Sequence, residues 1–217
     1  HNSSSIRGLS LDLNDQPVSN IAWQDAALFC NWLSEKENLP KFYNVVGDRV
    51  TSINWDSNGY RLPTESEWSW VAKVTKAGST KVFPWNSPSY PPPFVSGNYA
   101  DESAKSMLPF TISNYNDSFP VSASVGSFRP NEKGIFNLSD NVAEWVNDFY
   151  EIRVNKSEPL VDYRGPNTGN RHVIRGASWA LGSRSELRLS YREPGYDGKI
   201  DVGFRIARYV DKPKGDL

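Results

Sequence analysis

The sequence predicts an irregular, loop-rich α/β (α+β) fold with two main helices and short strands. Apolar residues recur with helical spacing between about residues 24 and 36, and a helix-capping pattern followed by a second apolar stripe begins at Thr64. Between Ala77 and Pro130, by contrast, Gly, Pro, Ser and Asn are dense. The 217 residues suffice for one hydrophobic core, and the chain has no internal repeat or low-complexity linker. We therefore expect a single domain over residues 1–217.

The first helix is expected over about residues 24–36. Its apolar residues recur every three or four positions and share one face: Ala26, Phe29, Cys30 and Leu33. Asn38 and Pro40 mark its end. Cys30 is the only cysteine of the chain, so it cannot form an internal disulfide, and its place in the apolar stripe indicates a buried structural thiol.

The second helix is expected to begin at Thr64. The Thr64 hydroxyl can accept a hydrogen bond from the Glu67 amide while the Glu67 carboxylate accepts one from the Thr64 amide. Trp68, Val71 and Ala72 then supply the buried stripe. Short alternating strands are expected at residues 172–175 and 202–206.

The long segment between the second helix and these strands needs a source of order. Three consecutive prolines at positions 91–93 force an extended run that cannot enter a sheet interior. A compact domain rarely keeps such a stretch unless side-chain or metal contacts organise it. We expect such contacts between residues 77 and 130.

Composition argues against two classes of partner. The formal net charge is −1, so the chain lacks the basic excess that neutralises phosphates, and no nucleic acid partner is expected. No apolar run reaches the length of about 18 residues that a membrane span requires, so no membrane span is expected.

Six motifs occur along the chain in a recognisable order. They are PVSNIAWQDA (17–26), GYRLPTESEW (59–68), FPW (83–85), NLSDNVAEW (137–145), VIRGASW (173–179) and GFRIAR (203–208). Together they resemble the formylglycine-generating enzyme (sulfatase-modifying factor) family. The resemblance implies a loop-rich module related to the C-type lectin fold. It also implies that the family's glycine-rich opening segment is missing, so that the chain is truncated or is completed by another chain or segment.

The resemblance also bears on redox chemistry. Oxidase members of the family bind copper through two cysteines between the last two motifs, whereas this chain is cysteine-free there. The matching positions are Leu181 and Glu186, and neither side chain replaces a thiolate for copper(I). Copper and formylglycine formation are therefore not expected. A further branch uses a three-histidine iron site, but this chain contains only His1 and His172, and a lone histidine in a strand is typically structural.

Two Ca²⁺ sites are implied by the resemblance, since calcium is bound by carboxylate, amide and carbonyl oxygens. The first matches Asn98, Tyr99, Asp117 and Phe119, with Tyr99 and Phe119 contributing carbonyls. The second matches Asn137, Asp140, Val142 and Glu144. Asp140 replaces the family's Gly, but only its carbonyl is needed. Taken without the resemblance, Asn and Asp in such loops are more often turn formers.

The segment 181–196 is the candidate ligand surface. Arg184, Arg188 and Arg192 recur there every four residues beside Tyr191. Such a run commonly marks a solvated face, but guanidinium groups also bind carboxylate or phosphate and stack on aromatic rings. The segment matches the active-site surface of the family. The ligand contacts we predict are Trp179, Arg184, Glu186, Arg188 and Tyr191.

These observations predict a calcium-stabilised, non-catalytic module that binds a peptide, glycan or small polar ligand, or that serves as a scaffold in a larger protein. The resemblance implies that it is extracytoplasmic. The alternative is an enzyme similar to the periplasmic pyoverdine-maturation branch, which carries out oxidative tailoring in siderophore biosynthesis. Such an enzyme would use acid–base groups such as Glu186 or Tyr191.

Overall fold

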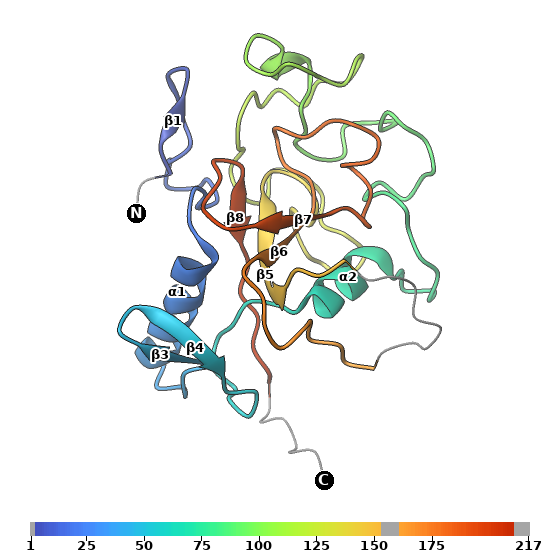
Figure 1. Ribbon diagram of the computed structural model, residues 1–217. Helices are drawn as coiled ribbons and strands as arrows, with labels where there is room; N and C mark the ends of the chain where they lie inside the picture. The colour runs from blue at the N-terminus through green and yellow to red at the C-terminus, as the bar shows by residue number, and fades with distance from the viewer. Residues whose placement is uncertain (1–2, 153–160, 211–217) are drawn as a thin grey trace.

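A computed structural model describes residues 3–152 and 161–210. Its centre is a four-stranded sheet with the strand order β7-β6-β5-β8 (Figure 1). The strands are β5 (Ala143–Phe149), β6 (His172–Arg175), β7 (Arg192–Gly195) and β8 (Val202–Phe204). β6 is antiparallel to both β5 and β7, whereas β8 is parallel to β5. The expected strand at 172–175 is confirmed, and the one expected at 202–206 ends at Phe204.

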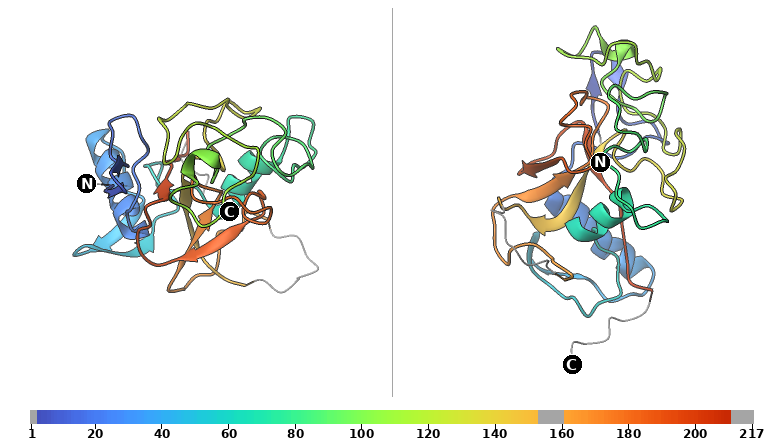
Figure 2. Two further views of the ribbon diagram at one scale, coloured as in Figure 1. Left: turned by 90° about the horizontal axis from the view of Figure 1, so that it is seen from above. Right: turned by 90° about the vertical axis from the view of Figure 1, so that its right-hand side faces the viewer.

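Helix α1 (Trp23–Lys36) packs on this sheet together with the antiparallel hairpin of β3 (Tyr43–Val46) and β4 (Arg49–Ile53). Figures 1 and 2 show these elements on one side of the molecule and the long loop region on the other. The apolar core between helix, hairpin and sheet is formed largely by Trp23, Ala26, Ala27, Cys30, Phe42, Tyr43, Leu62, Trp145 and Ile174.

The buried face of α1 differs from the predicted stripe. Phe29 is 42 % exposed, whereas the polar residues Asn31 and Ser34 are buried. Asn31 exchanges two hydrogen bonds with the Tyr43 backbone, at 2.7 and 3.0 Å, and Ser34 donates to the Cys30 carbonyl at 2.8 Å. Polar side chains that find partners can be buried at little cost, so hydrophobicity alone placed the face incorrectly. Cys30 is buried and free, as predicted.

Helix α2 (Glu65–Lys73) begins with the predicted capping box. The Glu67 amide donates to Thr64 Oγ1 at 3.1 Å, and the Thr64 amide donates to Glu67 Oε2 at 2.8 Å. Trp68 and Ala72 are buried and Val71 is partly buried, as expected. The Glu67 carboxylate also forms an ion pair with Arg61, which is only 2 % exposed.

The loop region contains one short 3-10 helix, η1 (Glu102–Ala104), among its described residues. It is organised by an aromatic cluster that contains Phe83, Trp85, Tyr99, Ile112, Tyr115, Ala177 and Leu187. Side-chain contacts therefore order this segment, as one of the two expectations, side-chain or metal contacts, had it.

The chain begins with a small hairpin of β1 (Ser5–Ile6) and β2 (Leu9–Ser10). It leads to Leu11, which is buried against Val121, Val142 and Trp179. None of the helices formed by residues 3–152 and 161–210 has the length and apolar character needed to cross a membrane.

Candidate functional site

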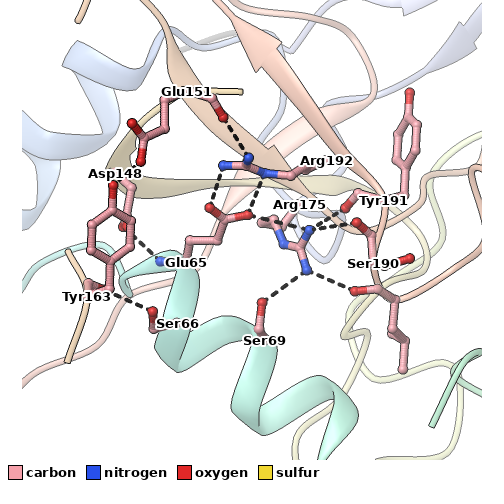
Figure 3. A network of polar contacts seen from close by, with 11 residues as sticks. Glu65, Ser66, Ser69, Asp148, Glu151, Tyr163, Arg175, Ser190, Tyr191 and Arg192 are labelled. Carbon is pink, nitrogen blue, oxygen red and sulfur yellow. Dashed lines mark hydrogen bonds and ion pairs between the residues drawn. The ribbon is translucent and has the colours of Figure 1, made fainter. Parts of the chain in front are cut away.

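The end of the candidate ligand segment is held in place by Arg175, at the end of β6. Its guanidinium donates to the carbonyls of Leu189 at 2.8 Å and Tyr191 at 2.5 Å, and to Ser69 Oγ on α2 at 3.0 Å (Figure 3). It also lies 3.6 Å from Glu65. Because Arg175 is only 2 % exposed, this network ties the segment to the sheet and to α2 away from solvent.

Arg192, the third arginine of the predicted series, belongs to the same network. It donates to both carboxylate oxygens of Glu65, at 2.8 and 2.6 Å, and to the Glu151 carbonyl at 2.8 Å (Figure 3). Because these contacts engage its guanidinium, Arg192 has a structural role. In the same network, burial lowers the pKa of Arg175 to about 10, although the nearby Glu65 opposes this shift.

Trp179 does not lie on the predicted ligand surface. It is 1 % exposed and packs against Leu11, Val121 and Val142. Its burial depends on residues that are distant in the sequence, so the spacing of the arginines after it could not indicate it. In this structure Trp179 is enclosed by the protein's own side chains, and it is left out of the proposed ligand surface.

The other predicted ligand residues differ in exposure. Arg184 and Arg188 are exposed, and Tyr191 is half-buried. Glu186 accepts hydrogen bonds from the amides of Ser183 at 2.9 Å and Gly182 at 3.3 Å, so its carboxylate stabilises its own turn. Burial, with the nearby acidic side chains, raises the pKa of Tyr191 to about 12.

We call Asn98, Tyr99, Asp117 and Phe119 the first oxygen set. Asp117 accepts hydrogen bonds from the amides of Tyr99 and Phe119, each at 2.9 Å, and its own amide donates to Asp101 at 2.5 Å. Asp101 and Asp117 are both buried, at 0 % and 5 % exposure. Burial, together with the facing Asp101 carboxyl, raises the pKa of Asp117 to about 7.

Asn98 adds an oxygen without a partner to this set. It is fully buried, and its amide nitrogen donates to the Val121 carbonyl at 2.8 Å. Within the described part of the chain, its Oδ1 accepts no hydrogen bond. Two neighbouring carboxylates and a free amide oxygen are the donor types that calcium prefers, so the first oxygen set fits a calcium ion. Asp101 was not among the calcium ligands predicted from the sequence. Its position three residues after Asn98 could have indicated that it lies near the same site.

We call Asn137, Asp140, Val142 and Glu144 the second oxygen set. Here the Glu144 carboxylate already has a cation, because Arg205 of the GFRIAR motif donates to both of its oxygens at 2.7 and 2.6 Å. Trp68 donates to the same carboxylate at 2.8 Å, and the Asn137 Oδ1 accepts from the Gly126 amide at 2.8 Å. The Glu144 carboxylate is thus balanced by Arg205 and the Asn137 Oδ1 already accepts a hydrogen bond, so these two side chains are less suited to calcium than the Asn98 Oδ1 of the first oxygen set.

Val142 and Asp140 complete the second oxygen set. Val142 is 6 % exposed and packs in the same cluster as Trp179. Asp140 is 4 % exposed, and burial raises the pKa of its carboxyl to about 7. Among residues 3–152 and 161–210, no three His, Cys, Asp or Glu side chains converge on one point.

His172 is a packing residue, as its sequence context indicated. Its ring stacks on Trp23, with the centroids 3.6 Å apart, and on Phe149 at 4.3 Å. Its Nδ1 lies 3.1 Å from the Asn147 carbonyl oxygen. Burial lowers the pKa of His172 to about 4.

Comparison with known sequences identifies the family. The sulfatase-modifying factor enzyme 1-like domain of the formylglycine-generating enzyme (FGE) family matches residues 3–210. The chain belongs to this family. The chaperone protein LppX of Paenibacillus barcinonensis is 30% identical over 220 residues, which cover 89% of this chain and 70% of LppX. The formylglycine-generating enzyme of Streptomyces coelicolor is 27% identical over 207 residues, which cover 93% of this chain but 55% of that enzyme.

Solved structures of similar fold support the same assignment. Treponema denticola variable protein 1 superposes with a TM-score of 0.72 at 26% identity, covering 98% of this chain and 78% of that one. PvdO from Pseudomonas aeruginosa superposes with a TM-score of 0.65 at 23% identity, covering 92% of this chain and 64% of PvdO. The predicted FGE-like fold is thereby confirmed, including its two helices and short strands.

Proposed function

We propose that this FGE-like domain is a non-catalytic binding module ordered by one calcium ion. The observation that carries the proposal is the state of the two positions that match the copper-binding cysteines. Leu181 packs on the aromatic cluster of the loop region, and Glu186 is held by the amides of its own turn. Neither presents a thiolate, so the surface that would bind copper is available for recognition instead.

The calcium ion is assigned to the first oxygen set together with Asp101. Its support is the pair of buried carboxylates and the unpartnered Asn98 Oδ1. Calcium bound there would offset the repulsion between Asp101 and Asp117 and join residues 98–101 to residues 117–119. The proposal limits calcium to this set, because Arg205 balances the charge of Glu144 in the second.

The ligand surface is assigned to Arg184, Arg188 and Tyr191. Arg184 and Arg188 are exposed on a segment whose end is fixed by Arg175. Guanidinium groups on a fixed backbone favour carboxylate or phosphate groups. We therefore expect an anionic peptide, glycan or small polar ligand, and we place the domain outside the cytoplasm, as a binding unit or a scaffold of a larger protein.

Binding to acidic probes tests this assignment. A uronic-acid oligosaccharide and a glutamate-rich peptide are titrated against the full chain and against the double variant Arg184→Glu, Arg188→Glu. Charge reversal should weaken binding by about tenfold or more. Arg49→Glu, an exposed arginine on the β3–β4 hairpin, is the matched control and should change affinity less than about twofold. Equal losses in both variants would contradict the assigned surface.

A second candidate function is oxidative tailoring of the kind implied for the pyoverdine-maturation branch. The likeness to PvdO concerns the fold alone, so this candidate rests on Glu186 and Tyr191: burial and nearby acidic groups, Glu186 among them, raise the pKa of Tyr191. An oxidase should consume oxygen with a bound substrate and retain stoichiometric copper or iron, whereas the binding module should retain calcium. Elemental analysis of protein purified without chelators separates the two candidates.

A further inference from the structure

A cavity of about 600 Å³ opens between the loop residues 81–99 and 129–140. Its volume lies in the range of about 300–1,000 Å³ that is typical of small-molecule sites. The wall combines apolar side chains, among them Trp85, Phe94 and Leu138, with charged ones that include Lys81, Arg129 and Glu132. None of the arginines of the proposed ligand surface lines it, so this cavity is a separate feature of the molecule.

Three buried polar atoms belong to side chains that line this cavity and lack hydrogen-bond partners in the described part of the chain. They are Asp140 Oδ1, Tyr99 Oη and Ser96 Oγ. The other Asp140 oxygen, Oδ2, accepts a long hydrogen bond, 3.4 Å from Asn137 Nδ2. A buried polar group without a partner costs about 1–3 kcal/mol, and more if it is charged, so these atoms indicate a missing binding partner.

Gly97 shows how closely two of these groups approach. A Cβ at position 97 would lie 2.6 Å from Asp140 Cβ and 2.8 Å from Tyr99 Oη. Both distances are shorter than the contacts that Cβ atoms make in proteins. Glycine at this position therefore allows the Asp140 carboxylate and the Tyr99 hydroxyl to lie together on one side of the cavity.

No ion pair joins Asp140 to a cation among the described residues, although Lys81 and Arg129 also line the cavity. The guanidinium of Arg205 is engaged by both oxygens of Glu144. The aromatic ring of Trp85 lines the same cavity and stacks on Phe83, with the centroids 4.6 Å apart. A carboxylate beside aromatic rings is complementary to an organic cation, which gains an ion pair and a cation–π contact at once.

We propose that this cavity binds a small primary ammonium compound, whose NH₃⁺ group donates to Asp140 Oδ1 and Tyr99 Oη and whose apolar part lies against Trp85 and Phe94. The inference does not involve the arginine surface proposed above, because neither Arg184 nor Arg188 lines the cavity. It shares Tyr99 with the first oxygen set, but the calcium proposal uses the Tyr99 carbonyl and this one uses its hydroxyl.

Calorimetric titration of the full chain tests the proposal with a series of primary amines, from butylamine to phenethylamine and tryptamine. Each amine is paired with the alcohol of the same skeleton. At least one amine should bind saturably, and its alcohol should bind about tenfold or more weakly, because the hydroxyl lacks the charge. No saturable binding in the series, or equal binding of amine and alcohol, would overturn the proposal.

Two variants locate the binding site. Asp140→Asn keeps the side-chain volume but removes the charge, and it should weaken amine binding by about tenfold or more. Phe94→Ala removes a 58 % exposed ring from the cavity wall and should weaken binding by about threefold without affecting folding. Phe110→Ala, which removes a 53 % exposed ring outside the cavity, is the matched control. Amine binding that survives both cavity variants unchanged would show that the site lies elsewhere.

Discussion

The first and second oxygen sets bury their carboxylates to a similar extent but balance the charge in different ways. Asp101 and Asp117 are 0 % and 5 % exposed and face each other, whereas Glu144 is 3 % exposed and faces the guanidinium of Arg205. Among the described residues no ion pair balances Asp101 or Asp117, whereas Arg205 neutralises Glu144. Motif resemblance alone does not distinguish the two, because the cation beside Glu144 is Arg205, which follows β8 about 60 residues further along the chain.

The largest effect should follow from removal of the internal cation. Arg205→Met leaves Glu144 buried without a counter-charge, and we expect the free energy of unfolding to fall by about 3–5 kcal/mol. Urea denaturation measures the change. Arg208→Met, which removes an ion pair with Glu37 at 3.8 Å between half-exposed side chains, should cost less than about 1 kcal/mol. A similarly small loss for Arg205→Met would show that Glu144 does not depend on this pair.

Removal of calcium should have the next largest effect, and only through the first oxygen set. At calcium concentrations about 100-fold above the dissociation constant, a chelator should lower the free energy of unfolding by about 2–3 kcal/mol. Asp117→Asn should abolish this difference. Asp201→Asn changes a partly buried aspartate outside both sets, which accepts a hydrogen bond from Ser178, and should retain the difference. A wild-type protein that is equally stable with and without chelator would contradict the calcium proposal.

Acid should destabilise the sheet side of the molecule without involving either set. The folded pKa of His172 is about 4, below its ordinary value of 6.5, so its contribution to stability is present above pH 6.5 and is lost as the pH falls towards 4. The loss should be on the order of 2 kcal/mol. In His172→Phe, the free energy of unfolding measured by denaturation should depend less steeply on pH over this range. The difference in slope between the variant and the wild type should be the same with and without calcium. Parallel curves for the two proteins would refute this assignment.

The smallest expected effect concerns Asp101, which the motifs did not reveal. In the presence of chelator at pH 8, Asp101→Asn removes the repulsion with Asp117 and should stabilise the fold by about 1 kcal/mol. In the presence of calcium the same change should weaken calcium binding by about tenfold. Thermal unfolding and calorimetric titration measure the two effects. Destabilisation under both conditions would indicate that Asp101 serves the η1 turn rather than the ion.

The elements that depend on neighbouring residues were predictable from the sequence. The Thr64–Glu67 capping box needs only residues three apart, and the structure contains it as expected. The buried face of α1 was less predictable, because Asn31 is buried through hydrogen bonds to Tyr43, a strand residue that helical periodicity does not include. The burial of Trp179 was hard to predict for a similar reason, since it depends on Leu11 and Val121 from distant segments.

The sequence by itself determined the family, the two helices, the loop-rich character and the absence of thiolates at positions 181 and 186, since these follow from residue identity and local spacing. The tertiary structure decided which carboxylates are neutralised and which side chains reach the surface. Charge balance in a protein interior depends on distances between groups far apart in the chain. Arg205 beside Glu144, Asp101 beside Asp117 and the unpartnered Asp140 therefore became visible only once the chain was folded.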